Sequence, residues 1–174
     1  MTLLKSYYQL CKPNVVYMML ICAFVGMLLA EESVNSYGYL FVALLGITLC
    51  AASAAAINQV VDRNTDASMT RTDQRPLPQG EISASHASIF AFVIGLMGAL
   101  TLYFFVNTLT MILTLASLVG YAFIYTIYLK RATPQNIVIG GLAGAAPPLL
   151  GLSLIHISEP TRQAEISYAV FCLK

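Results

Sequence analysis

Long apolar segments separated by short polar stretches run through the chain. Four of them are long enough, or nearly so, to cross a hydrocarbon core about 30 Å thick, which takes about 20 helical residues. These expected spans cover residues 14–30, 39–61, 84–106 and 108–129. A fifth segment starts after Thr133-Pro134, where proline suits a helix start, and runs from Ile137 to Gly151. The pattern predicts an all-α, polytopic transmembrane helical bundle.

Composition supports a lipid environment for these segments. The chain is 58% hydrophobic and 10% charged, with a mean hydropathy of +0.75, whereas a soluble domain carries about 25% charged residues. The net charge of +1 is too small to attract a polyanion by bulk electrostatics. We therefore expect the lipid bilayer as a partner and no nucleic acid.

The basic residues are distributed unevenly between the ends of the expected spans. The opposite-side turns, residues 31–37 and the region around Asn107, carry none of them. By the positive-inside rule, the N-terminus and the 62–83 loop face the cytoplasm. The residues that share this side are Lys5, Lys12, Arg63, Arg71, Arg75, Lys130 and Arg131.

An acidic motif stands at the end of the second expected span. Asn58, Asp62 and Asp66 are spaced i, i+4 and i+8, which places their oxygen-bearing side chains on one helical face. A carboxylate costs about 2.5–3.5 kcal/mol at the bilayer centre on insertion scales, and less near the interface. Acids retained at such a position indicate a functional site.

The chemistry of this motif suits a magnesium ion and a phosphorylated substrate. Oxygen ligands without histidine or cysteine are typical of Mg²⁺, which usually binds one or two carboxylates together with substrate phosphates. Nearby cations would bind the phosphate oxygens. The alternative is a solvated helix end with loop cations that only mark topology, and spacing alone does not separate the two. The candidate phosphate-binding cations are Arg63, Arg71, Arg75, Lys130 and Arg131.

Three further features are better explained by packing than by ligand binding. Small residues fill 51–56 and 140–146, so we expect these helices to pack closely at the bundle centre. His86 is isolated from other ligand types at a helix start, which favours an interfacial or packing role. The same applies to the helically spaced Tyr121, Tyr125 and Tyr128, which remain candidates for lining an aromatic cavity.

From Leu10 to Gly151 the sequence resembles the UbiA-type intramembrane prenyltransferases, and closely the heme O synthases among them. The first string that carries the resemblance is Asn58-Gln59-Val60-Val61-Asp62-Arg63-Asn64-Thr65-Asp66. The second is Met69-Thr70-Arg71-Thr72, followed by Arg75-Pro76-Leu77-Pro78. The third, and the most specific to heme O synthases, runs from Tyr128-Leu129-Lys130-Arg131 to Gly140-Gly141.

The resemblance implies a bundle of about nine spans in which two aspartate-rich motifs bracket a cavity. Asn58, Asp62 and Asp66 map onto the first motif as catalytic ligands of Mg²⁺ and diphosphate. The implied reaction is transfer of the farnesyl group of farnesyl diphosphate to a vinyl group of heme B, and the implied location is the bacterial cytoplasmic membrane. The basic residues would help to neutralise the diphosphate charge. Asn136 is a weaker candidate for the same site.

The family pattern stops after Gly151. Residues 152–174 resemble translated sequencing-adapter DNA, so we divide the chain into 1–151, the N-terminal part of a prenyltransferase domain with four to five helices, and a non-native tail. Such a chain would lack the second acidic motif, and we expect it to be inactive alone.

Two other functions stay open on the sequence. One is a UbiA-type enzyme with another acceptor, such as 4-hydroxybenzoate or a chlorophyll precursor. The other is a membrane transporter or scaffold, which would spread its acids along the membrane depth.

Overall fold

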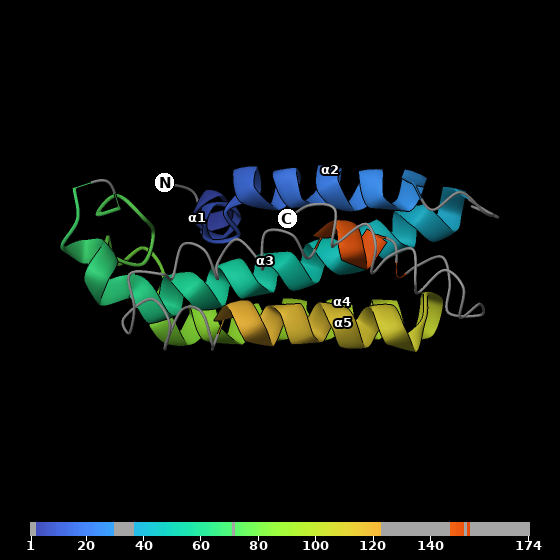
Figure 1. Ribbon diagram of the computed structural model, residues 1–174. Helices are drawn as coiled ribbons and strands as arrows, with labels where there is room; N and C mark the ends of the chain where they lie inside the picture. The colour runs from blue at the N-terminus through green and yellow to red at the C-terminus, as the bar shows by residue number, and fades with distance from the viewer. Residues whose placement is uncertain (1–2, 30–36, 71, 123–146, 152, 154–174) are drawn as a thin grey trace.

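The architecture is a set of long helices lying side by side (Figure 1). The computed structural model describes residues 3–29, 37–70, 72–122, 147–151 and 153. No strand occurs within these ranges, and the predicted all-α class is confirmed. In Figure 1, α3 runs through the middle, with α2 on one side and α4 and α5 on the other. The helices are α1 (Leu3–Leu10), α2 (Pro13–Leu29), α3 (Tyr37–Ala67), α4 (Ala84–Phe105) and α5 (Thr108–Val119).

The helix bounds agree with the hydropathy pattern at α2 and α4 and differ from it at α3. The helix α3 ends at Ala67 and not at residue 61, because the polar residues after the apolar stretch continue the same helix. Among the described residues, α3 and α4 are each long and apolar enough to cross a membrane. The pair α1 and α2, bent by 48°, passes the same test as one broken span.

The later part of the expected bundle is described only in pieces. The apolar helix that starts at Thr108 is described up to Ala122, so the end of the span expected over 108–129 lies outside the described residues. Of the fifth expected span, residues 147–151 are described and are helical from Pro147 to Gly151. Added Cβ atoms on Gly26 and Gly151 would collide with the backbone of Pro148 and Ala23, so this segment packs tightly against α2.

Small residues allow α3 and α4 to approach closely. A Cβ atom on Gly98 would lie 2.9 Å from the carbonyl oxygen of Gly46, and one on Gly95 would lie 2.6 Å from Oγ of Ser53. The hydroxyl of Ser53 donates to the carbonyl of Ala91 at 2.7 Å. The predicted packing of the 51–56 run is confirmed, since residues 52–56 are buried. The 140–146 run lies outside the described residues.

A small cluster holds the ends of α1, α3 and α4 together where the acidic motif lies. Leu10, Ala56, Ile82, Ala87 and Ala91 form its buried part. The rings of Tyr7 and Phe90 extend the cluster, with centroids 4.8 Å apart. The 68–83 loop leads into α4 through Ser83, whose side chain caps the helix by accepting from the backbone nitrogen of His86.

Candidate active site

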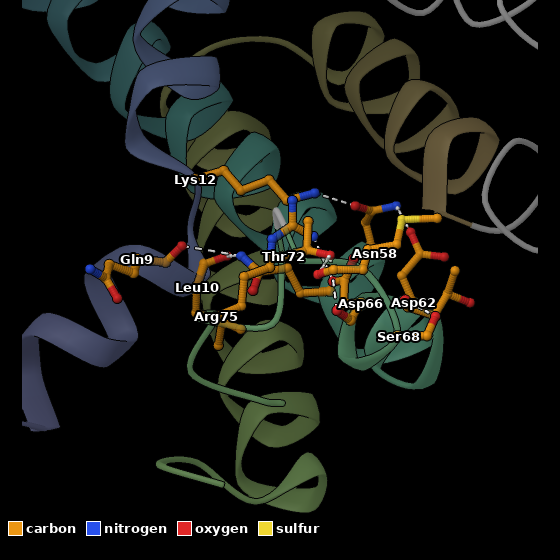
Figure 2. Close-up of polar contacts among 12 residues, drawn as sticks. Gln9, Leu10, Lys12, Asn58, Asp62, Asp66, Ser68, Thr72 and Arg75 are labelled. Carbon is orange, nitrogen blue, oxygen red and sulfur yellow. Dashed lines mark hydrogen bonds and ion pairs between the residues drawn. The ribbon is translucent and has the colours of Figure 1, made fainter. Parts of the chain in front are cut away.

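The acidic motif lies on the last turns of α3, and its side chains are buried. Asn58 is 5%, Asp62 4% and Asp66 5% exposed. Figure 2 shows all three on the same stretch of α3, with side chains from α1, the α1–α2 break and the 68–83 loop around them. A solvated helix end would leave these groups in water, so their burial argues for a specific arrangement.

Charge at this end of α3 is unusual for a helix. A helix C-terminus carries partial negative charge and favours lysine or arginine, not carboxylates. The last turn of α3 contains no basic residue, while Asp62 and Asp66 add two negative charges there. On the same helix Arg63 is exposed, and further cations come from other parts of the chain.

The first such cation is Lys12, whose place in the sequence indicates only the side of the membrane on which it lies. Its ammonium group donates a hydrogen bond to Oδ1 of Asn58. The amide nitrogen of Asn58 in turn donates to Oδ2 of Asp62 at 3.2 Å. Lys12 stands at the break between α1 and α2 with a φ of 50°. No sequence pattern marked it, because its contact with Asn58 joins residues 46 positions apart.

The second cation is Arg75, one of the predicted phosphate-binding residues. Its Nη1 lies 2.5 Å from Oδ2 of Asp66, and the two side chains are 30% and 7% exposed. The hydroxyl of Thr72 donates to the backbone carbonyl of Asp66 at 2.9 Å, which folds the loop back onto the helix end. The loop thus brings a guanidinium group to the acidic face, which is the surface of α3 formed by Asn58, Asp62 and Asp66 (Figure 2).

Of the other residues singled out from the sequence, the structure describes only some. Arg63 is exposed and, three residues before Asp66, lies next to it on the helix surface. His86 is exposed and its ring nitrogen Nδ1 lies 3.0 Å from Oγ of Ser83, in agreement with a local role at the helix start. The residues that lie outside the described ranges are Arg71, Tyr125, Tyr128, Lys130, Arg131 and Asn136.

An apolar cavity of about 230 Å³ lies next to the acidic face. Lys12 belongs to its wall, and on α3 the lining runs from Ile47 to Ala55. At 1.5 Å per residue, Ile47 is roughly 16 Å along the helix from Asn58. Lys12 thus lies between the acidic motif and the apolar cavity. The other walls come from α2, α5, Tyr121 and the 147–151 segment.

The side-chain oxygen atoms of the acidic face fit Mg²⁺ better than a metal ion whose ligands all come from the protein. Among the described residues, no group of three or more histidine, cysteine, aspartate or glutamate side chains could hold a metal ion. The described donors are two carboxylates and the amide oxygen of Asn58. Mg²⁺ commonly binds through one or two carboxylates, and completes its octahedron with water and substrate phosphates.

Comparison with known proteins gives the family. The pattern of the UbiA prenyltransferase family matches residues 19–173. The chain belongs to this family. Its match with the family runs into the segment 152–174, whose proposed non-native origin stays a prediction.

Curated relatives in this UbiA family are similar over the N-terminal half of their length. The chain is 57% identical over 151 residues to "Protoheme IX farnesyltransferase 2" of Pseudoalteromonas atlantica, covering 87% of the chain and 50% of that protein. It is 59% identical over 147 residues to "Protoheme IX farnesyltransferase" of Idiomarina loihiensis, covering 84% and 49%. The chain therefore spans about half the length of these relatives.

Solved structures of the family share the fold. A UbiA homolog from Archaeoglobus fulgidus bound to DMAPP and Mg²⁺ superimposes with a TM-score of 0.77 at 20% identity, covering 89% of this chain and 56% of that one. The same homolog bound to GPP and Mg²⁺ gives a TM-score of 0.71.

Proposed function

We propose that residues 1–151 are the N-terminal half of a heme O synthase, an Mg²⁺-dependent enzyme that transfers the farnesyl group of farnesyl diphosphate to a vinyl group of heme B. The observation that carries the proposal is the 54–59% identity to proteins named protoheme IX farnesyltransferase over nearly all of this segment. The buried acidic face beside an apolar cavity supports the proposal on chemical grounds.

The acidic face is the site proposed for the diphosphate end of the donor. Asn58, Asp62 and Asp66 would hold Mg²⁺, which neutralises negative charge on the leaving diphosphate when it is bound. The proposal is supported by the UbiA homolog described as bound to DMAPP and Mg²⁺, which has the same fold. Arg75 and Lys12 bring positive charge to the same face and would bind phosphate oxygens.

The proposed reaction breaks the C1–O bond of the donor, the vinyl π bond of heme B and one O–H bond of water, and it forms one C–C bond and one C–O bond. The C1–O bond of farnesyl diphosphate breaks, and the electron pair leaves with diphosphate. The vinyl π electrons of heme B then bond to C1, and a water molecule captures the resulting cation and loses a proton to give the hydroxyethylfarnesyl side chain. The buried position of the acidic face and the apolar cavity wall limit the access of bulk water to the farnesyl cation.

We further propose that the acidic face lies at the cytoplasmic side of the bacterial cytoplasmic membrane. The described cations Lys5, Lys12, Arg63 and Arg75 all lie at the same end of the helices as the acidic motif. Such clustering supports a cytoplasmic position by the positive-inside rule.

A full-length chimera tests the proposed function. Residues 1–151 would be joined to the C-terminal half of the Pseudoalteromonas atlantica relative and expressed in bacteria that lack their own heme O synthase. We expect extracted heme to include heme O, identified by its added farnesyl mass. The matched control carries Asp62→Asn and should yield heme B alone.

The chimera also separates the alternatives. Prenylation of 4-hydroxybenzoate or of a chlorophyll precursor, with heme B unchanged, would keep the family chemistry and overturn the acceptor. An absence of any prenylated product from a chimera that is folded and inserted in the membrane would contradict the proposed function.

A further inference from the structure

We propose that Gln59 is a positioning residue that fixes α1 against α3 and thereby holds Lys12 over the acidic face. The inference rests on the proposed function only for the role of Lys12 toward diphosphate. The contacts that carry it lie within the described residues and need no ligand.

Gln59 uses its amide group to bind the end of another helix. It is 2% exposed, and its Nε2 donates to the backbone carbonyls of Gln9 at 3.1 Å and Leu10 at 3.0 Å. These carbonyls belong to the last turn of α1, where carbonyls lack partners within their own helix. The carbonyl of Gln9 also accepts from the backbone nitrogen of Lys12 at 3.1 Å, just beyond the helix end. A primary amide has two donor hydrogens, one for each carbonyl. Figure 2 shows Gln9 and Leu10 beside the acidic motif.

The chain changes direction immediately after these two carbonyls. Lys12 adopts a φ of 50°, in the left-handed region that residues with a Cβ rarely occupy. The axes of α1 and α2 differ by 48°. A strained backbone of this kind persists only when its surroundings fix it. The bonds from Gln59 and the fully buried side chain of Leu10 do so here.

This turn determines where the lysine side chain goes. From the left-handed turn, the ammonium of Lys12 reaches Oδ1 of Asn58, the residue next to Gln59 in the sequence. Two adjacent residues of α3 thus hold the same turn. Gln59 binds the backbone carbonyls that precede the turn, and Asn58 accepts from the side chain of Lys12 within it. One turn earlier on α1, Ser6 donates to Oε2 of Glu81 at 2.5 Å, which links the helix to the loop that carries Arg75.

The consequence is that the position of Lys12 at the acidic face depends on contacts of α1. If Gln59 loses its donors, the carbonyl of Leu10 is left buried without this partner, and α1 gains freedom to move. Lys12 would then sample positions away from Asn58. Arg75 would keep its direct bond to Asp66.

The first test measures whether Gln59 holds α1. Ser6 is 1% exposed, so Ser6→Cys in a variant without other cysteines reports on docking of α1. In membranes containing the full chain, we expect Gln59→Met, which keeps the shape and removes both donors, to raise the rate of maleimide labelling at position 6 by about tenfold. The control Lys5→Gln changes an exposed residue of the same helix and should leave the rate unchanged. Equal rates in the Gln59→Met and parent proteins would overturn the proposal.

The second test asks whether the effect passes through Lys12. In the full-length chimera, the dissociation constant of farnesyl thiodiphosphate with Mg²⁺ should rise about tenfold for Lys12→Gln and by a similar factor for Gln59→Met. The double variant should bind no more weakly than Lys12→Gln alone, because the two changes remove one interaction. Multiplicative effects would show that Gln59 acts independently of Lys12 and would overturn the positioning role. A parent chimera that does not bind the analogue would contradict the proposed function, while the labelling rate would still decide whether Gln59 holds α1.

Discussion

Replacement of Gly98 by alanine should destabilise the bundle at the contact between α3 and α4. The new Cβ atom would lie 2.8 Å from Sγ of Cys50, 2.9 Å from the carbonyl oxygen of Gly46 and 3.0 Å from the backbone nitrogen of Cys50. Two of these three atoms belong to the backbone of α3, so rotation of a side chain cannot relieve the contact. The helices must move apart by several tenths of an ångström, and the acidic face is carried on the helix that moves.

Overpacking of this kind costs about 1–3 kcal/mol. For a chain of this length, such a loss lowers the melting temperature by roughly 2–4 °C per kcal/mol. The control is Gly120→Ala, because a Cβ atom there meets none of the described residues within 4 Å and the backbone is helical, with φ −56° and ψ −47°. That change should be neutral or stabilise the helix by up to about 1 kcal/mol.

Thermal unfolding in one detergent, followed by circular dichroism, would measure the difference between the two variants. We expect Gly98→Ala to melt at a lower temperature than the parent and Gly120→Ala at the same or a higher one. Adding Cys50→Ala to Gly98→Ala should recover only part of the loss, since both backbone contacts remain. Identical melting temperatures for Gly98→Ala and Gly120→Ala would refute the close packing of α3 and α4.

Two further predictions concern the loop and the orientation of the chain. Arg75→Gln should lower stability by about 1–3 kcal/mol, because Asp66 stays buried without its partner while the exposed part of Arg75 limits the loss. Addition of Asp66→Asn should restore much of the melting temperature, and a further drop would contradict this reasoning. In intact cells, an impermeant thiol reagent should label Ser33→Cys and leave Ser68→Cys, at an exposed position after α3, unlabelled. Labelling of Ser68→Cys alone would invert the proposed topology.

Much of the fold was predictable because the lipid environment imposes a strong pattern on the sequence. The bounds of α2 and α4 follow from the apolar runs within one residue. The hydropathy pattern predicted the helices wrongly where residues outside the apolar runs are also helical. Helix α3 continues through polar residues to Ala67, and the short helix α1 precedes the first apolar run.

The candidate site was predictable only as far as it is local in sequence. The spacing of Asn58, Asp62 and Asp66 was sufficient to predict a shared helical face. The roles of Lys12 and Gln59 were missed, since their contacts connect α3 with residues about 50 positions away. Nothing in the spacing of Lys12 distinguishes it from the other cations at the same membrane face. Its proximity to the acids depends on the turn that follows α1.

If the acidic face of α3 binds the Mg²⁺-diphosphate end of a prenyl donor, as proposed, farnesyl transfer must depend on Asp62 and Asp66. In the full-length chimera, farnesyl transfer would be measured against Mg²⁺ concentration for Asp62→Asn, Asp66→Asn and the control Asp73→Asn, which removes the same charge from the neighbouring loop. Loss of electrostatic stabilisation of a leaving group costs about 10²–10³ in rate. We expect losses of at least this size for the first two variants and near-parental turnover for Asp73→Asn. Parental turnover and unchanged Mg²⁺ dependence in Asp62→Asn or Asp66→Asn would contradict the proposed binding.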